Sequence, residues 1–121
     1  MFEGTLISES LRTGAGLDAV PLTVRKIARY AIGDATADQP AIWTAIDFEV
    51  ADPDAEALAA ALAGALGDRG WYANFQSAAE AYVVFAGQVF RYPRGDAAGR
   101  ASAQAYGRQA GVPEAQLDWT V

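Results

Sequence analysis

The sequence contains neither cysteine nor histidine, and these two absences exclude much of the chemistry that proteins perform. Without cysteine there is no disulfide and no thiolate metal ligand. Without histidine, the common zinc sites and the usual neutral-pH general base are missing, and no serine has a partner for a triad-type mechanism. We therefore expect no metal and no cofactor. The composition favours a protein that is not an enzyme, since catalysis would have to rely on carboxylates, tyrosines or Lys26.

The chain also lacks long apolar segments and an excess of positive charge. Its longest weakly polar run, residues 55–66, is alanine-rich and shorter than the roughly 20 residues that a membrane span requires. The first ten residues have neither the basic start nor the apolar stretch of an export signal. A net charge of −6 and a pI near 4.4 oppose contacts with a phosphate backbone. We expect a cytoplasmic protein that binds neither membranes nor nucleic acids.

What the sequence does contain is enough large apolar side chains for one core. Its 121 residues include three Trp, five Phe and five Tyr, and 52% of the residues are hydrophobic. A chain of this size can bury enough surface to fold without disulfides or metals. We expect a single α+β domain that spans residues 1–121.

Alternation of apolar and polar residues predicts six strands, and two alanine-rich segments with helix-capping signals predict helices. The predicted strands are residues 2–11, 20–32, 42–50, 71–76, 82–85 and 89–92, and the predicted helices are residues 53–66 and 97–109. This order, βββαβββα with short links, favours a two-layer sandwich in which a mostly antiparallel sheet carries both helices on one face. We expect the first strand at an edge of the sheet and the second in an exposed or edge position.

The best-defined local unit is the hairpin-to-helix segment from Tyr82 to Gly111. Gly87 supplies the turn between two β-rich runs, and Asp96 is placed to cap the following helix. Three arginines lie near this corner, Arg91, Arg94 and Arg100, and together with the helix N-terminus they could hold an anion. Asp96 would repel such an anion, so we favour an Arg–Asp96 brace that fixes the turn.

If both helices cover one face, the other face of the sheet is open and needs a partner. Taking even positions of strands two and three as facing the helices leaves these residues on the open side: Arg25, Ile27, Arg29, Trp43, Ala45, Asp47 and Glu49. On strand four, the alternation does not decide whether Trp71 or Tyr72 points outward. The candidate ligand or interface residues are therefore Arg25, Arg29, Trp43, Tyr72, Arg91, Arg94 and Arg100.

Three functions fit these surfaces. The leading hypothesis is a non-enzymatic protein-interaction module that forms a homodimer through the open sheet face. The alternative is a small-molecule binding protein or minor enzyme, in which arginines and Trp43 hold an anionic ligand. A third hypothesis, an inhibitor or immunity-type protein that masks a basic partner, rests on the net acidity alone.

Three segments of the chain carry a resemblance: residues 70–75 (Gly-Trp-Tyr-Ala-Asn-Phe), residues 83–96, which include Val89-Phe-Arg-Tyr-Pro-Arg-Gly-Asp96, and residues 111–119. Together they resemble a group of small uncharacterised actinobacterial proteins of unknown function. The resemblance implies a bacterial cytoplasmic origin and one domain, and it assigns no reaction, cofactor, partner or site residue.

Overall fold

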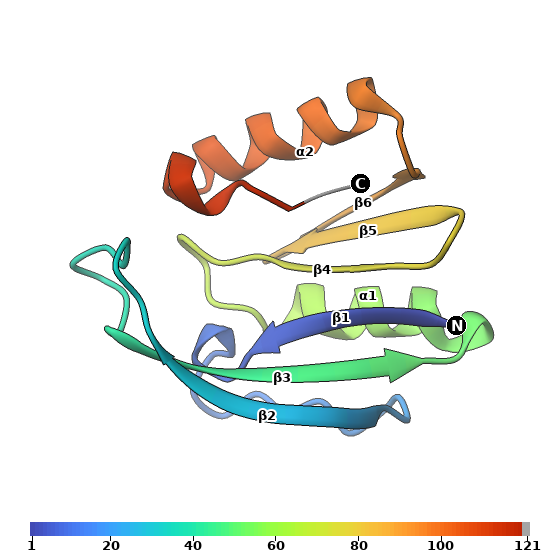
Figure 1. Ribbon diagram of the computed structural model, residues 1–121, viewed down its shortest axis with the longest axis horizontal. Coiled ribbons are helices and arrows are strands. Elements are labelled where there is room, and N and C mark those ends of the chain that lie inside the picture. Colours follow the sequence, from blue (N-terminus) through green and yellow to red (C-terminus); the bar gives the residue numbers. More distant parts are fainter. Residues whose placement is uncertain (120–121) are drawn as a thin grey trace.

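The computed structural model describes residues 1–119 of the chain, and its six strands form one antiparallel sheet with two α-helices. The sheet order is β2-β3-β1-β4-β5-β6 (Figure 1). The strands are β1 (Phe2–Ile7), β2 (Thr23–Ala31), β3 (Ile42–Val50), β4 (Ala73–Gln76), β5 (Glu80–Phe85) and β6 (Gln88–Pro93). The helices are α1 (Ala55–Ala65) and α2 (Ala97–Gln109), and short 3-10 turns lie at Ser8–Ser10, Asp52–Asp54 and Glu114–Gln116. The predicted α+β class and the order βββαβββα are confirmed.

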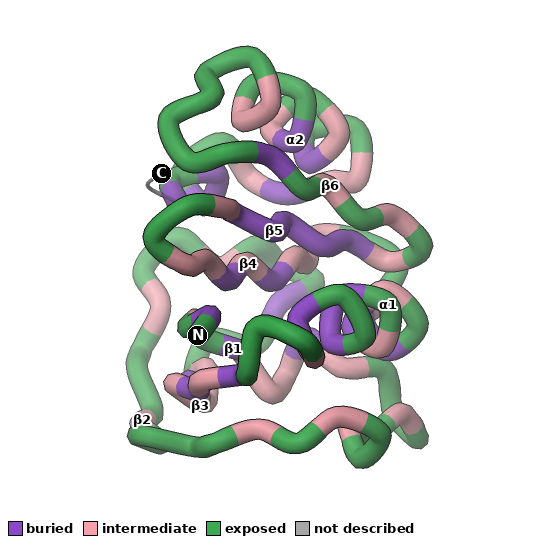
Figure 2. Tube along the Cα trace, turned by 90° about the vertical axis from the view of Figure 1, so that its right-hand side faces the viewer, coloured by how far each residue is buried: buried purple, intermediate pink, exposed green. Residues whose placement is uncertain are grey.

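The two helices pack on opposite faces of the sheet, so the predicted placement of both on one face is wrong. Alternate residues of β5 divide between two cores: Tyr82 and Val84 pack with α1, whereas Val83 and Phe85 pack with α2. Successive side chains of a strand point to opposite faces, so the two cores lie on opposite sides. In Figure 1, α1 lies behind the sheet and α2 lies beyond β6, and in Figure 2 β5 is buried along nearly its whole length.

β1 lies in the middle of the sheet, between β3 and β4, so the predicted edge position for the first strand is wrong. Its central position depends on Gly4, which lies opposite Phe75 of β4. A Cβ atom at Gly4 would lie 2.5 Å from the backbone oxygen of Asn74 and 2.7 Å from the Cβ of Phe75. The absence of a side chain therefore allows β4 to approach β1 closely.

β2 is an edge strand, as predicted, but a bulge at Arg25 reverses which of its residues face which way. Val24 lies opposite Phe48 and Lys26 lies opposite Asp47, so Arg25 is the extra residue. After the bulge, the residues that share a face with Trp43, Ala45 and Asp47 are Tyr30, Ala28 and Lys26. The prediction that Ile27 and Arg29 share a face with Trp43 is therefore wrong. Period-2 counting fails here because a bulge adds one residue without a partner.

The helices leave part of the sheet uncovered. We call the face that carries α1 the first face and the face that carries α2 the second face. On the first face, α1 and the segment of residues 11–22 pack against β1, β3, β4 and β5 through Leu11, Leu17 and Leu22 among others. On the second face, α2 and the segment after it cover β4 to β6. The part of the second face formed by β2, β3 and β1 remains uncovered, and we call it the open face. Its side chains include Glu3, Thr5, Lys26, Tyr30, Trp43 and Asp47.

The hairpin-to-helix unit has the predicted form. Phe85 pairs with Gln88 across the two-residue turn, and Gly87 has a φ of 75°. The carboxylate of Asp96 accepts hydrogen bonds from the N–H groups of Ala98 and Gly99 at 3.1 and 3.2 Å. The C-terminal segment docks through buried Leu117 and Trp119, as predicted. By contrast, the predicted cap at Asp52 is wrong, since residues 52–54 form a 3-10 turn and α1 starts at Ala55.

Substitution of Gly4 by alanine is expected to lower the free energy of unfolding by about 2–3 kcal/mol, because the new Cβ atom would overlap β4. The matched control is Gly64→Ala in α1, where a Cβ atom meets nothing within 4 Å. That change should raise the free energy of unfolding by about 0.5–1 kcal/mol, the helix-propensity gain. Urea unfolding of the two variants measures both effects, and equal midpoints would contradict the close approach of β1 and β4.

Candidate functional site

A pocket of about 260 Å³ lies where the open face meets the C-terminal segment, and we call it the tryptophan pocket. Trp43 comes from β3, and Trp71, Tyr72 and Asn74 come from β4 and the residues leading into it. Asp118 comes from the C-terminal segment. Asp34, from the loop between β2 and β3, also lines the pocket. Thr5 and Ile7 of β1 line it as well, so the site brings together segments from the start, the middle and the end of the chain.

The walls of the pocket are aromatic and held in place by specific contacts. The rings of Trp43 and Trp71 lie 5.1 Å apart at an angle of 54°, within the range of favourable aromatic pairs. The indole N–H of Trp43 donates to the carbonyl oxygen of Pro40 at 2.8 Å. The ring of Tyr72 lies 5.0 Å from that of buried Trp119. Both candidates of the fourth strand, Trp71 and Tyr72, line the pocket, because both precede the first residue of β4 and strand alternation does not apply to them.

Two buried glutamines, of which Gln116 lines the pocket, exchange hydrogen bonds and join three segments. The amide nitrogen of Gln39 donates to the side-chain oxygen of Gln116 at 3.1 Å, and the amide nitrogen of Gln116 donates back at 2.9 Å. Gln39 also donates to the carbonyl oxygen of Gly70 at 3.0 Å, and Gln116 donates to that of Asp34 at 3.1 Å. This amide pair holds the β2–β3 loop, the start of the β4 segment and the C-terminal segment together.

Tyr72 is held in its neutral form. Its hydroxyl group donates to the carbonyl oxygen of Gln116. Burial raises the pKa of Tyr72 well above its usual range, the carboxylate of Asp118 adds to the effect, and the Arg100 guanidinium opposes it. A phenol with a raised pKa is not ionised near neutral pH, so Tyr72 serves as a wall and an anchor of the pocket and not as a base or nucleophile.

The charge of the pocket is negative. Asp34 and Asp118 line it, and neither lysine nor arginine does. Among residues 1–119, the ion pairs are those of the N-terminal amine, Arg25, Arg91 and Arg108, and none of them uses these two aspartates. The predicted combination of Trp43 with arginines for an anionic ligand is therefore not what the fold builds around Trp43.

The predicted arginines of β2 are separated from each other. Arg25 forms a two-pronged ion pair with Glu49, at 2.8 and 2.9 Å, and its guanidinium lowers the pKa of that carboxylate. Arg29 lies opposite Thr44, on the face that carries Ile27. Because the two arginines lie on different faces, they cannot converge on one ligand.

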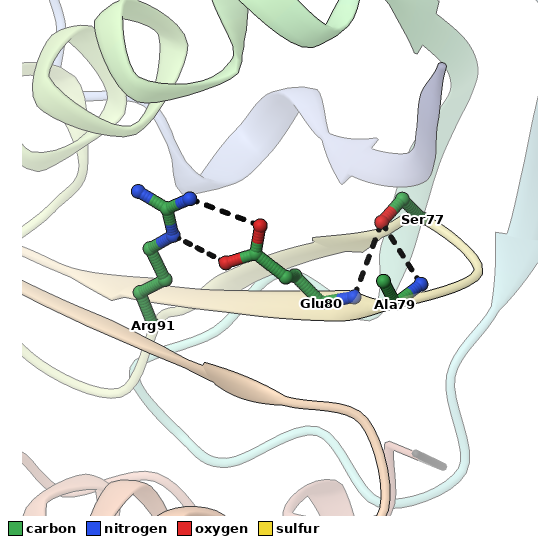
Figure 3. Close-up of polar contacts among 4 residues, drawn as sticks. All are labelled: Ser77, Ala79, Glu80 and Arg91. Carbon is green, nitrogen blue, oxygen red and sulfur yellow. Dashed lines mark hydrogen bonds and ion pairs between the residues drawn. The ribbon is translucent and has the colours of Figure 1, made fainter.

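At the hairpin corner, Arg91 is neutralised by Glu80 of the neighbouring strand (Figure 3). The Nε and Nη2 atoms of Arg91 donate to the two carboxylate oxygens at 2.5 and 2.9 Å, and this pairing lowers the pKa of Glu80. The guanidinium also lies 5.4 Å from the ring centre of Tyr82. In the adjacent turn, the hydroxyl oxygen of Ser77 accepts from the N–H groups of Ala79 and Glu80 (Figure 3).

The other two arginines of the corner bind main-chain carbonyl groups. Arg94 donates to the carbonyl oxygen of Ser77 at 3.2 Å. Arg100 donates twice to that of Trp119, at 3.1 and 2.7 Å, and lies 5.8 Å from its ring centre. The predicted Arg–Asp96 brace is therefore wrong, since Asp96 caps the helix by itself and the arginines bind elsewhere. Their three separate partners leave no shared anion site at this corner.

Sequence reasoning identified Trp43 and Tyr72, left Trp71 undecided, and missed Asp34, Asp118 and the glutamine pair. The missed residues lie outside the strands and the two α-helices, where neither strand nor helix periodicity indicates a direction. A buried polar pair such as Gln39 and Gln116 has no sequence pattern either, since the two residues are 77 positions apart. Within residues 1–119, no group of three or more acidic side chains is placed to hold a metal ion, and no helix is long and apolar enough to cross a membrane.

The glutamine pair yields a test of how the pocket is held. Gln39→Ala and Gln116→Ala should each lower the free energy of unfolding by about 1–3 kcal/mol, because the remaining amide is left buried without its partner. The double variant should lose about 1–2 kcal/mol less than the two single losses combined. Gln109→Ala, at an exposed position of α2, is the control and should change the stability by less than about 0.5 kcal/mol. Strictly additive losses in urea unfolding would contradict the pairing.

No protein-family model, no curated protein and no solved structure matches this chain. The geometry of its surfaces is therefore the basis for assigning a function.

Proposed function

We propose that the protein is a non-enzymatic interaction module that forms a two-fold symmetric homodimer, with β2 of one copy pairing along β2 of the other. The observation that carries the proposal is the outer edge of β2. Among residues 1–119, this nine-residue strand pairs with β3 alone, and every residue of it except Ala28 is exposed (Figure 2). An edge strand of this length presents unpaired N–H and C=O groups that favour the addition of another strand.

Apolar side chains gather at the same edge. Val24, Ile27 and Tyr30 of β2 are 51%, 65% and 49% exposed, and Ile42 of β3 is 48% exposed. Two other large apolar residues, Met1 and Val89, are also exposed, and neither lies on β2 or β3. Val24, Ile27 and Ile42 lie on the face of the sheet that carries α1, and Tyr30 lies on the open face, so this edge is apolar on both faces. Exposed apolar side chains that lie together typically mark an interface, because leaving them in water costs free energy. A β2–β2 contact would bury them from both copies.

Positive charge on β2 restricts the pairing to few registers. The charged residues of the strand are Arg25, Lys26 and Arg29, and charges on an edge strand usually discourage pairing. With Ala28 opposite Ala28 of the second copy, Lys26 lies opposite Tyr30 and Ile27 lies opposite Arg29, so no two cations face each other. Moving the centre of the pairing from Ala28 to Ile27 brings Arg29 opposite Arg25. Moving it to Arg29 brings Arg29 opposite Arg29 of the second copy. Like charges directly opposite are destabilising, so the Ala28 register is favoured.

The pattern of hydrogen bonds between β2 and β3 is compatible with this register. The N–H of Ile32 donates to the carbonyl oxygen of Ala41 at 2.8 Å, and alternate residues back to Ala28 point their main-chain groups toward β3 in the same way. The main-chain N–H and C=O groups of Ile27 and Arg29 consequently point away from β3, where the β2 strand of a second copy can bind them. Ala28 then forms a non-hydrogen-bonded pair with its copy, at a Cα separation of about 4.5 Å, and its small side chain leaves room for that approach.

A bacterial cytoplasmic origin and membership of the actinobacterial group remain parts of this proposal, and both rest on the sequence. Compared with the two alternatives, self-association is favoured by the location of the exposed apolar residues. An anion-binding function would need arginines that converge, and an inhibitor of a basic partner would need a defined acidic surface.

The absence of native cysteine allows a direct test by single-cysteine cross-linking. Ala28→Cys should form a disulfide-linked dimer under mild oxidation, because the Cα separation of a non-hydrogen-bonded pair falls within the roughly 4.4–6.8 Å that a disulfide requires. Ile27→Cys is the matched control on the neighbouring residue, and it should cross-link much less, since its side chain lies opposite position 29. Non-reducing electrophoresis measures both.

The solution mass of the unmodified protein complements this test. Light scattering should give twice the 12.7 kDa of one chain. A single-chain mass at every concentration would refute the dimer. A dimer in which the Ile27→Cys variant cross-links as readily as the Ala28→Cys variant would refute the register and the β2–β2 contact.

A further inference from the structure

We infer that the tryptophan pocket is a binding site for a small organic cation, with the charged nitrogen held by Asp34 and Asp118 and the organic body held by Trp43 and Trp71. This inference is independent of the β2–β2 dimer, because the pocket uses the opposite end of the open face from Arg25 and is lined by no residue of β2.

The aromatic walls are suited to a cation. Trp43 and Trp71 are half-buried and both line the pocket, so each side chain has surface that a ligand can reach. Indole faces attract ammonium groups more strongly than the other aromatic side chains do. Tyr72 adds a third ring, and its hydroxyl group is already bound to the carbonyl oxygen of Gln116. Three aromatic side chains that meet around one hollow form the kind of surface that recognises amines.

The two carboxylates determine that the pocket attracts positive charge. Asp34 and Asp118 line the pocket and are exposed, on two different loops that the Gln39–Gln116 pair holds together. No ion pair within residues 1–119 neutralises them, whereas Glu49, Glu80 and Glu114 are each paired with an arginine. An anion would be repelled by both aspartates. A cation would gain two charge contacts on entering, and these steer and orient it.

The size of the pocket limits the ligand. Its volume of about 260 Å³ is just below the roughly 300 Å³ at which pockets for drug-sized ligands begin. The part of a ligand that the pocket can enclose is therefore an amine with one ring or a few carbon atoms. Asn74, which also lines the pocket, can accept or donate hydrogen bonds to a polar group of the ligand, and the Thr5 hydroxyl, which donates to Asp47, can accept one.

A charge series on one scaffold tests the inference. Benzylamine, benzyl alcohol and benzoate have the same ring and are cationic, neutral and anionic near pH 7. Two-dimensional NMR of ¹⁵N-labelled protein should show saturable shifts of the Trp43 and Trp71 indole signals with benzylamine, weaker shifts with benzyl alcohol and none with benzoate. Trp43→Phe and Trp71→Phe assign the two signals, and the main-chain signal of Gly87, in the β5–β6 turn and outside the pocket, is the internal reference.

Charge-removing variants then locate the binding. Asp34→Asn and Asp118→Asn should each weaken benzylamine binding about fivefold, the effect of one solvent-exposed charge at close range. Asp38→Asn removes the same charge from the same loop outside the pocket and should leave the affinity unchanged. Urea unfolding of each variant shows whether the fold is intact.

The inference is overturned if benzoate or benzyl alcohol binds as tightly as benzylamine, if the shifts map away from Trp43 and Trp71, or if neither Asp34→Asn nor Asp118→Asn weakens binding. Absence of saturable benzylamine binding up to high millimolar concentration overturns it as well. Because none of these measurements depends on β2, a negative result leaves the dimer standing, and a monomeric protein that binds benzylamine supports the pocket alone.

Discussion

Strand β5 has apolar side chains on both faces, and the requirement to cover both of them determines the rest of the architecture. Tyr82 and Val84 on one face need α1, and Val83 and Phe85 on the other need α2 with the C-terminal segment. Leaving either set in water would cost several kcal/mol, since a fully buried large apolar side chain contributes about 1.5–3 kcal/mol. One helix on each side of β5 meets this requirement with only two helices. The consequence is that neither helix extends over β2.

The uncovered part of the sheet is where the molecule can interact. β1 and β3 are protected on one face by α1 and residues 11–22, but their other face has no helix, and β2 has neighbours on one edge only. The arginines do not fill this space, because most of them bind within the chain: Arg25 to Glu49, Arg91 to Glu80 and Arg100 to the Trp119 carbonyl group. What remains is a cationic apolar edge at β2 and an anionic aromatic hollow beside Trp43.

These two surfaces have opposite chemistry and are suited to different occupants. Main-chain groups and aliphatic side chains at the edge favour another strand, whereas ring faces and carboxylates in the hollow favour a small cation. They share β3, because Trp43 lies opposite Tyr30 in the register. The two surfaces therefore adjoin at the cross-strand pair of Tyr30 and Trp43, although no residue of β2 lines the tryptophan pocket.

The sequence by itself determined the local structure. The alternation in residues 42–50, the turn at Gly87 and the cap at Asp96 are each decided by neighbours within a few positions, and all three are present in the fold. Only the tertiary structure decided which strand is central, which face each side chain occupies and which loops meet. Those outcomes depend on long-range features: the close approach at Gly4, the bulge at Arg25 and the pairing of Gln39 with Gln116. No periodicity in the sequence predicts these features, because each depends on residues that are distant along the chain and neighbours in the structure.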